Sequence, residues 1–293
     1  MWLQIIGKVR LALAPPLNHW WHVPLYVTPR GLTTSLIPYR ERAFQVDIDF
    51  IEHRLTVTDG TTTPFSMALE PKSVAAFYRE FMGGLRSRGI DVSIWPHPVE
   101  ITDAIPFDQD EQHASYDPEH ARMLWRSFVQ AERVLQAFRT GFIGKASPTH
   151  LFWGGFDLAT TRFSGRTAPR HGGGIPNCAD WVMQEAESHE NFCVGLWPIA
   201  AAGPTFYAYI YPEPAGFKLA DVGPPAASYN EDAGEFLLPY DAVRGSVDPD
   251  ASLREFLQST YEAAANLGGW DRVALEPVEQ PSRRPTRAWS RGS

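Results

Sequence analysis

The chain has little cysteine and a deficit of positive charge. Its 293 residues include two cysteines, Cys178 and Cys193, too few for a disulfide framework or a cysteine-rich zinc site. Because Cys193 lies in the apolar run 192–196, we expect a buried free thiol there. The 26 lysines and arginines stand against 34 aspartates and glutamates, a net charge of −8. This balance argues against a nucleic-acid partner, since phosphates are neutralised by clustered basic residues.

Long uncharged apolar runs are also missing, so the sequence predicts no membrane-spanning helix and no membrane partner. The apolar start, residues 1–14, ends in Ala12-Leu13-Ala14, the composition of a signal-peptidase site. However, Lys8 and Arg10 interrupt this run, and no basic stretch precedes it. Apolar residues at helical spacing predict an amphipathic first helix instead. We therefore expect a cytoplasmic protein.

Several catalytic signatures are absent from the sequence. It contains no Gly-x-Ser-x-Gly nucleophile elbow, no Walker loop, no Rossmann glycine fingerprint and no zincin helix. Neither cysteine stands in a recognisable catalytic motif. Covalent acyl transfer therefore has no support in the sequence, and no cofactor is identified.

An internal similarity at an offset of 132 residues is the most informative feature that the chain does have. Segments 2–31 and 134–163 share seven identical residues, whereas unrelated segments of this length share about two by composition. The matching pairs are Leu3 and Leu135, Gln4 and Gln136, Ala14 and Ala146, Pro16 and Pro148, Trp21 and Trp153, Thr28 and Thr160, and Arg30 and Arg162. We predict a tandem duplication with a ligand cleft between the two copies.

The element order predicts an α+β fold with antiparallel sheets, because strands and helices come in blocks without regular βαβ alternation. Each copy reads as an α–β-meander–α unit, and the two copies would be related by a pseudo-two-fold axis. Each copy ends in a helix that carries Arg-Glu-Phe, at 79–81 and at 254–256. The offset has grown from 132 to 175 there, which indicates an insertion of 43 residues in the second copy.

The predicted organisation has four parts. Residues 1–102 form the first repeat, and the acidic stretch 103–116 connects it to the second repeat, residues 117–271. Residues 272–293 are rich in proline, arginine and serine, and we expect a basic, disordered tail. The strands are predicted at 25–28, 32–37, 44–50, 54–58, 65–69, 92–95, 151–163, 192–197, 206–211 and 235–238, and the main helices at 1–14, 71–90, 117–142 and 248–268.

The repeated Trp-x6-Thr-x-Arg motif supplies one set of candidate site residues. Along a strand, Thr and Arg two positions apart share a face, so Arg30 and Arg162 could grip one carboxylate or phosphate. Trp21 and Trp153 would wall the same cleft. The alternative is that each arginine pairs with an acidic neighbour as a repeated structural feature.

Histidines gather next to the motif in both copies. His19, His22, His150 and Asp157 could supply a metal site, since histidine and carboxylate suit zinc or iron. His19, His150 and Asp157 could equally act as acid and base without a metal. A single transition metal is therefore a possible cofactor, with His19, His22 and His150 as its candidate ligands.

The insertion and one strand complete the candidate set. The stretch 166–178 holds three consecutive glycines and two arginines, so it could form a mobile lid that attracts anions through Arg166; a plain surface loop is the alternative. Tyr207, Tyr209 and Tyr211 alternate along one strand face, and Tyr209 is our candidate for binding substrate. The alternative is that these tyrosines form the amphipathic side of a sheet.

Blocks of the sequence together resemble a bacterial family known as a domain of unknown function. The resemblance covers nearly the whole chain up to Asp271 and implies a bacterial, cytosolic protein. It implies no catalytic residue, because the family has no established activity, and the basic tail lies outside it. The blocks are Gly7–Leu13, Asn18–Trp21, Thr33-Thr34, His113–Pro118, Phe152–Gly154, Thr161–Arg166 and Gln258–Ala264.

Together these patterns predict an enzyme that acts on a small anionic metabolite in the cleft between the repeats. The two arginines would clamp the substrate, and a histidine would act as acid, base or metal ligand. A non-catalytic small-molecule sensor would use the same cleft but would show binding without turnover. A structural interaction protein is the third reading, since the chain has 10 tryptophans and 10 tyrosines.

Overall fold

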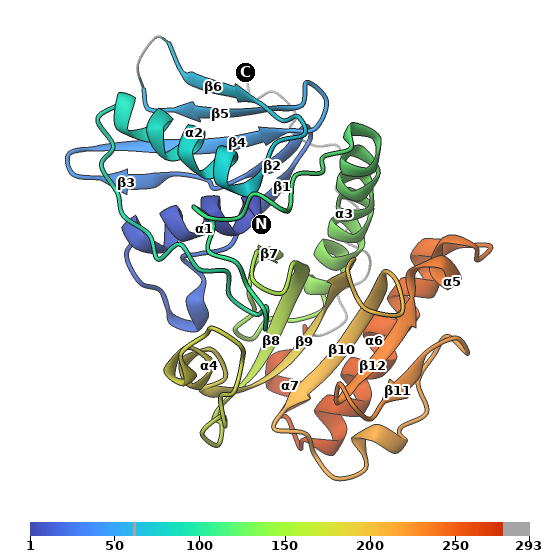
Figure 1. Ribbon diagram of the computed structural model, residues 1–293. Coiled ribbons are helices and arrows are strands. Elements are labelled where there is room, and N and C mark those ends of the chain that lie inside the picture. The colour runs from blue at the N-terminus through green and yellow to red at the C-terminus, as the bar shows by residue number, and fades with distance from the viewer. Residues whose placement is uncertain (61–62, 278–293) are drawn as a thin grey trace, which may run out of the picture.

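The computed structural model describes residues 1–60 and 63–277, which form helices and two antiparallel sheets of six strands each. The predicted α+β class is confirmed. Figure 1 places the sheet of the N-terminal half at the top of the view and the sheet of the C-terminal half at the bottom. We call them the N-terminal sheet and the C-terminal sheet.

The N-terminal sheet is a meander packed against two helices. The chain starts with α1 (Trp2–Leu13) and the short helix η1 (Asn18–Trp20), and α2 (Val74–Ser87) closes this half. Alternate residues of β4 are buried, as the sequence pattern predicts. The strands are β1 (Tyr26–Thr28), β2 (Gly31–Thr33), β3 (Ile37–Tyr39), β4 (Arg42–Asp49), β5 (Arg54–Thr58) and β6 (Phe65–Ala68), ordered β1-β2-β4-β5-β6, with β3 on β4.

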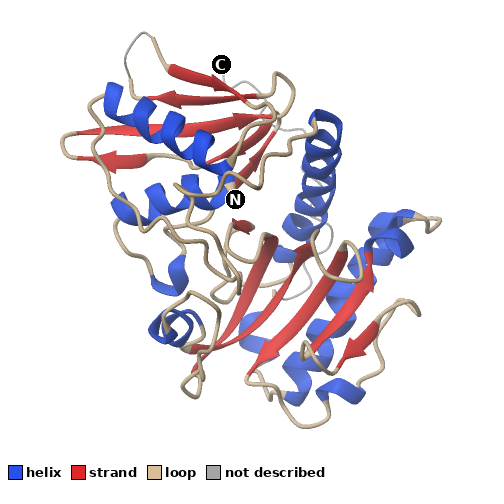
Figure 2. Cartoon of the chain, in the orientation of Figure 1, coloured by secondary structure: helices blue, strands red, loops and turns tan. Residues whose placement is uncertain are grey.

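The C-terminal sheet has the order β11-β12-β10-β9-β8-β7. Helices α3 and α6 cover one of its faces, and Figure 2 shows helices behind this sheet. The strands are β7 (His150–Phe152), β8 (Asp157–Thr167), β9 (His189–Trp197), β10 (Thr205–Tyr211), β11 (Ser228–Asn230) and β12 (Glu235–Pro239). The helices of this half are α3 (Pro118–Arg139), α4 (Asp180–Ala186), η2 (Phe217–Leu219), α5 (Tyr240–Arg244), α6 (Pro249–Leu267) and α7 (Arg272–Leu275).

Sequence signals at the two long helices are confirmed. The side chain of Asp117 accepts a hydrogen bond from the backbone N–H of His120, and Pro118 occupies the first helical position. Asp248 caps α6 in the same way. Each cap satisfies an N–H group that the first helical turn leaves without a partner.

The two halves share one hydrophobic core. Leu25 and Leu151 exchange two backbone hydrogen bonds of 2.9 Å, which join the edges of the two sheets. Helix α3 packs against β1 as well as β8 and α6, and the indole of Trp125 donates to the carbonyl of Thr28. Buried residues of both halves belong to a single cluster.

Four predicted segments differ from the structure. The strand predicted at 32–37 is interrupted, because β2 ends at Thr33, residues 34–36 form a loop, and β3 begins at Ile37. Residues 92–95 form a loop instead of the predicted strand. The strand prediction did not take account of Pro96 or of the packing of Trp95 against Lys8. The strand predicted at 151–163 is two strands, which are separated by a turn containing Gly154 and Gly155. Helix α7 extends the fold into the predicted tail, and the rest of that tail, 278–293, lies outside the described residues.

The duplication stays a prediction. Both halves place six antiparallel strands between helices, but Thr28 lies in the short strand β1 and Thr160 lies inside the long strand β8. The order of the last strands also differs between the two sheets. In the N-terminal sheet β5 and β6 follow in chain order, whereas in the C-terminal sheet β12 pairs with β10 and β11 lies outside it at the edge. The pseudo-two-fold axis and the repeat boundaries therefore rest on the sequence pattern.

Candidate functional site

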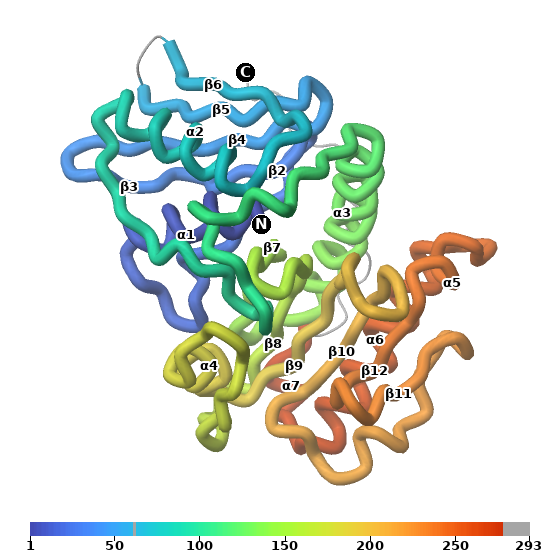
Figure 3. Tube along the Cα trace, in the orientation of Figure 1, coloured from blue at the N-terminus to red at the C-terminus, as the bar shows by residue number. Residues whose placement is uncertain are grey.

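A cavity of about 730 Å³ lies on the face of the C-terminal sheet that α3 and α6 leave uncovered. Segments of both halves wall it: α1 and η1, the loop 93–100, the turn 152–155, the loop 175–179 and α4. The tube in Figure 3 shows the chain between α2 and α3 descending to β8 and α4. Six tryptophans line the cavity, namely Trp20, Trp21, Trp95, Trp153, Trp181 and Trp197.

The sheet supplies the floor of this pocket through strand alternation. Along β8, Asp157, Thr161 and Phe163 line the pocket, whereas Leu158 and Arg162 are buried beneath the helices on the opposite face. Strands β9 and β10 add Cys193, Tyr207 and Tyr209 to the floor. Within the tyrosine face predicted from the sequence, Tyr207 is 6% exposed, and both Tyr207 and Tyr209 line the pocket.

Helix α1 forms one wall, because residues three or four apart share a helix face. Lys8 and Leu11 line the pocket from this helix. One turn before Lys8, the buried Gln4 side chain accepts a hydrogen bond from the N–H of Val99 at 2.9 Å and donates one to its carbonyl at 3.0 Å. Gln4 thereby fixes the loop that carries Glu100 against α1.

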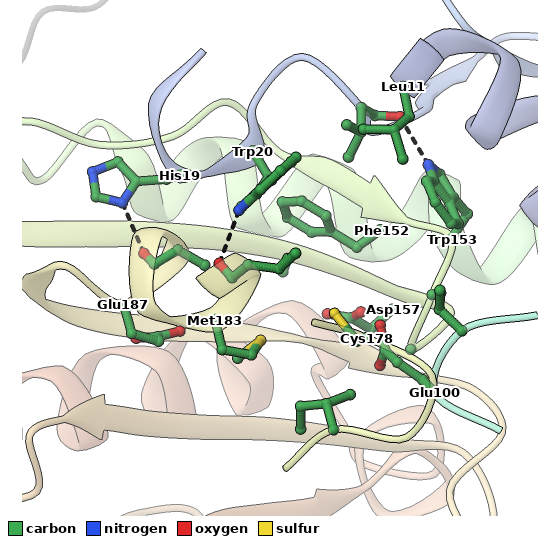
Figure 4. A pocket seen from close by; sticks show the side chains of 18 of the residues that line it. Leu11, His19, Trp20, Glu100, Phe152, Trp153, Asp157, Cys178, Met183 and Glu187 are labelled. Atoms are coloured by element: carbon green, nitrogen blue, oxygen red, sulfur yellow. Dashed lines mark hydrogen bonds between the residues drawn. The ribbon is translucent and has the colours of Figure 1, made fainter. Parts of the chain in front are cut away.

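Two carboxyl groups meet at one end of the pocket, as Figure 4 shows for Glu100 and Asp157. A Cβ atom at Gly155 would lie 3.1 Å from Oε2 of Glu100 and 3.3 Å from Oδ1 of Asp157. At Gly154 it would lie 2.0 Å from Oε1 of Glu100. The pair of glycines therefore makes the room that the Glu100 carboxyl occupies.

The surroundings keep these carboxyl groups protonated at higher pH than usual. Poor solvation, and then the charge of Asp157, raise the pKa of Glu100 to about 7, although water can reach its side chain from the cavity. Burial raises the pKa of Asp157 to about 6, against the opposing effect of the Tyr207 hydroxyl, which donates to Oδ2 at 2.5 Å. Burial and then Asp157 also raise the pKa of Glu235, to about 7.

A fourth acid, Glu187, is buried at the other end of the floor, immediately after α4. Its carboxylate accepts hydrogen bonds from Asn191 at 2.5 Å and from the hydroxyl of Tyr209 at 3.3 Å. Burial raises the pKa of Glu187 despite these bonds. The pocket thus combines aromatic walls with four acids, Glu100, Asp157, Glu187 and Glu235, and with Lys8 as its one lysine.

Backbone strain is concentrated around this pocket. Of the eight described residues other than glycine with positive φ, four line it: His19, Trp20, Glu100 and Asn177, with φ between 54° and 62°. Each such conformation costs of order 1 kcal/mol or more and persists only where neighbouring contacts hold it. The clustering shows that the shape of the pocket is held by its surroundings.

Hydrogen bonds between loops provide those contacts. The indole of Trp20 donates to the carbonyl of Val182 in α4, as drawn in Figure 4. The N–H of Glu100 donates to the carbonyl of Pro176 at 2.8 Å. The amide of Asn177 donates to the carbonyl of Ile101 at 2.7 Å. These bonds tie the glycine-rich loop 166–178 and α4 to the N-terminal half, and the end of that loop forms a wall of the pocket.

His19 lies in the wall with both ring nitrogens engaged. Nδ1 is 2.8 Å from the carbonyl of Ala186, and Nε2 is 2.7 Å from the ammonium of Lys145. These neighbours fix a neutral ring, because the carbonyl accepts from Nδ1–H and the ammonium donates to Nε2. Burial lowers the pKa of His19, which favours the same neutral state.

Five of the residues predicted from the sequence therefore come together in the pocket. They are His19, Trp21, Trp153, Asp157 and Tyr209. The other candidates, His22, Arg30, His150, Arg162 and Arg166, do not line it.

The structure does not bring the two arginines of the predicted clamp together. Arg30 is 54% exposed and pairs with Asp49 at 2.5 Å, the structural alternative raised by the sequence. Arg162 is 1% exposed on the helix-covered face, with its guanidinium 3.5 Å from the ring centroid of Phe138 and 4.2 Å from that of Tyr261. Arg162 lies on strand β8, but Arg30 lies in the turn between β1 and β2, so the predicted placement of both arginines on strands is wrong for Arg30. Sequence spacing also does not say which face of β8 the helices cover.

Arg166 also has structural partners. It pairs with Glu190 and donates to the carbonyls of Gly268 and Gly269 at the end of α6. These contacts hold the guanidinium of Arg166 outside the pocket.

His22 and His150 are buried away from the cavity. His22 accepts a hydrogen bond from the N–H of Leu17. His150 is 1% exposed among aromatic rings, and burial lowers its pKa to about 3. Across residues 1–60 and 63–277, no group of three or more His, Cys, Asp or Glu side chains is arranged to hold a metal ion. The histidines predicted as metal ligands thus stand in separate surroundings.

Sequence reasoning missed Glu100, Glu187, Glu235 and Lys8 as pocket residues. A signal existed for Lys8, since a charge that interrupts an apolar helix face calls for a partner or a cavity. The role of Glu100 depends on contacts across about 50 to 95 residues of chain, to Asp157 and Gln4, which no local pattern reveals. No helix among the described residues is both long and apolar enough to cross a membrane.

Comparisons with known proteins give one match. A family model described as "Family of unknown function (DUF5996)" covers residues 1–277, nearly the whole chain. Searches of the curated proteins and of the solved structures find no match.

Proposed function

The chain belongs to this family of unknown function, and from the chemistry of its pocket we propose that it is an enzyme that catalyses proton transfer on a small, largely apolar molecule. Glu100 would act as the general acid and Asp157 as the general base. The observation that carries the proposal is the pair of neighbouring carboxyl groups in a pocket with aromatic walls.

The pair meets the requirement for acid–base catalysis near neutral pH. An efficient catalytic acid or base has a pKa close to the working pH, and two carboxyl groups in one site separate their roles when their environments differ. The pKa of Glu100 is about 7, so this group still holds a proton near neutrality. The pKa of Asp157 is about 6, and the Tyr207 hydroxyl stabilises its ionised form.

The lining favours a neutral or cationic substrate over the anionic metabolite predicted from the sequence. Four acids and one lysine line the pocket, and the two arginines of the clamp lie elsewhere. An anion would meet the carboxylate of Asp157 in a poorly solvated space, where electrostatic repulsion is screened least. The tryptophans offer flat apolar surfaces to rings and hydrocarbon chains instead.

A panel of uncharged small molecules tests this function. Wild-type protein is incubated with ketones, esters, amides, epoxides and glycosides, and products are detected by mass spectrometry. Turnover should fall by roughly 100-fold or more in Glu100→Gln and in Asp157→Asn, the range for loss of a general acid or base. Glu231→Gln is the matched control, since Glu231 is exposed and pairs with Lys218. Turnover that is equal in all variants would contradict the proposal.

The second candidate function is a non-catalytic carrier or sensor of small apolar molecules. The six tryptophans favour it, because aromatic walls alone provide affinity for apolar ligands. Quenching of tryptophan fluorescence by panel compounds reports binding directly. Saturable quenching without turnover of any compound would favour this candidate over the enzyme.

A further inference from the structure

Resting on the proposed function, we infer that Lys8 is a nucleophile in this pocket and that the substrates are aldehydes or ketones, which its amine captures as an imine. The carboxyl of Glu100 would supply the proton for the loss of water. The observation behind this inference is a buried lysine that lines the cavity and has no ionic partner among residues 1–60 and 63–277.

Lys8 is 4% exposed yet lines the cavity. Its ammonium lies 4.8 Å from the ring centroid of Trp95. Within residues 1–60 and 63–277, no hydrogen bond or ion pair to its ammonium is found. A buried charged lysine is ordinarily paired, so an unpaired amine at a cavity wall calls for another explanation.

The other three lysines of the chain have partners. Lys72 pairs with Glu80 at 2.7 Å, and Lys218 pairs with Glu231 at 3.0 Å. The ammonium of Lys145 lies 2.7 Å from Nε2 of His19. Lys8 therefore differs from every other lysine in the sequence in a way that bears on reactivity.

Burial prepares the amine for this chemistry. Desolvation lowers the pKa of Lys8 to about 8, and the nearby Cys178 opposes this only in part. At pH 7 the unprotonated fraction is then roughly 300-fold larger than for a lysine with the ordinary pKa of 10.5. A desolvated lysine in an apolar pocket is a recognised form of activated nucleophile for carbonyl substrates.

The proposed acid, Glu100, lines the same pocket as Lys8, and Cys178 is a further lining residue. The charges of Glu100 and of Lys8 shift the pKa of the Cys178 thiol in opposite directions. Figure 4 shows Cys178 beside Glu100 and Asp157. Burial raises the pKa of the Cys178 thiol, which keeps it uncharged near neutrality. Gln4, one helical turn before Lys8, holds the backbone next to Glu100.

The step balances with the groups present. The unprotonated amine of Lys8 attacks the carbonyl carbon, and a proton moves from nitrogen to oxygen to give a carbinolamine. Glu100, as the neutral acid, then protonates the hydroxyl, the C–O bond breaks, and water leaves. The products are a protonated imine on Lys8 and the carboxylate of Glu100. Asp157, as a carboxylate, can next accept a proton from the carbon adjacent to the imine.

Reductive trapping tests the inference on the wild-type chain. Full-length protein is treated with benzaldehyde and sodium cyanoborohydride at pH 7, and the adduct is located by intact mass and peptide mapping. We expect one benzyl group, placed on Lys8 before any of the other lysines or the α-amino group reacts. Lys8→Met should lose the adduct and Lys218→Met should keep it. In Glu100→Gln, adduct formation should be roughly 100-fold slower at the same lysine.

The outcomes separate this inference from the proposed function. Labelling spread over Lys72, Lys145 and Lys218, with Lys8 no faster, would overturn the inference. The map is made on the wild type, so this result does not depend on the folding of a variant. If Lys8 stays unlabelled while panel turnover still requires Glu100 and Asp157, the nucleophile is wrong and the acid–base enzyme stands. If Lys8 is labelled and turnover ignores both carboxyl groups, the nucleophile stands and the acid–base pair is wrong.

Discussion

Replacing Asp157 with asparagine should make the protein less sensitive to rising pH. In the folded chain, burial raises the pKa of Asp157 from 3.8 to about 6. Between these two pKa values, Asp157 keeps its proton in the folded state but has released it in the unfolded state. The free energy of unfolding therefore falls as pH rises from about 4 to about 6 and levels off above pH 6. The shift corresponds to about 3 kcal/mol of unfolding free energy, at 1.36 kcal/mol for each pH unit.

Urea denaturation of wild type and Asp157→Asn between pH 4 and pH 8 measures this difference. Asparagine cannot ionise, and its amide oxygen can still accept the hydrogen bond that the Tyr207 hydroxyl gives to Asp157. Stability of the variant relative to wild type should therefore increase by roughly 2.5 kcal/mol from pH 4 to pH 8, because the unfolded chain has already released part of this proton at pH 4.

Asp250 provides a control of opposite sign. Its hydrogen bond with Arg133 lowers the pKa of Asp250, so its contribution to stability is present above the unfolded pKa and is lost as pH falls through the folded one. Asp250→Asn should lose stability relative to wild type at neutral pH and recover the difference in acid.

Parallel plots of stability against pH for wild type and Asp157→Asn would refute the claim that Asp157 is held in a poorly solvating site.

Three further substitutions follow from the structure. Gly154→Ala should displace the Glu100 carboxyl, because the new Cβ would lie 2.0 Å from Oε1 of Glu100. The high-pH limb of the plot of turnover rate against pH should therefore move, and an unchanged plot would argue against Glu100 as the acid. Gly7→Ala should destabilise the fold by about 1–3 kcal/mol in thermal unfolding, since the new Cβ would lie 2.1 Å from Nε1 of Trp153. If the variant were as stable as wild type, the indole ring of Trp153 would be free to move aside. Arg30→Ala should leave ligand binding unchanged in fluorescence titration and lower the free energy of unfolding by at most about 1 kcal/mol, as for exposed ion pairs. Weaker ligand binding in this variant would support the predicted arginine clamp instead.

Much of the fold could be predicted from local patterns. The alternation 44–50 and the cap at Asp117 each act over a few residues, and the structure has β4 and α3 where they indicate. The loop at 92–95 was predictable only in part, because Pro96 is a local signal against a strand whereas the packing of Trp95 beside Lys8 of α1 is distant in sequence. The C-terminal sheet order likewise depends on contacts distant in sequence.

The candidate site was predicted only in part, for a related reason. Alternation shows that Asp157 and Arg162 lie on opposite faces of one strand, but only the placement of α3 and α6 decides which face stays open. The sequence pattern directed attention to the arginines, whereas the open face carries the acid. Glu100 joins it from a loop that Gln4 and Pro176 hold in a left-handed conformation.

Direct titration of the pocket carboxyl groups tests the central claim of an acid–base pair. Protein labelled with ¹³C at the aspartate and glutamate carboxyl carbons is followed by NMR across pH 3 to 9, and Glu100→Gln and Asp157→Asn assign the two signals. The account predicts that Glu100 titrates near 7 and Asp157 near 6, and that removing Asp157 lowers the pKa of Glu100. Titration of both groups at the ordinary values for exposed carboxyl groups, below about 5, would contradict it.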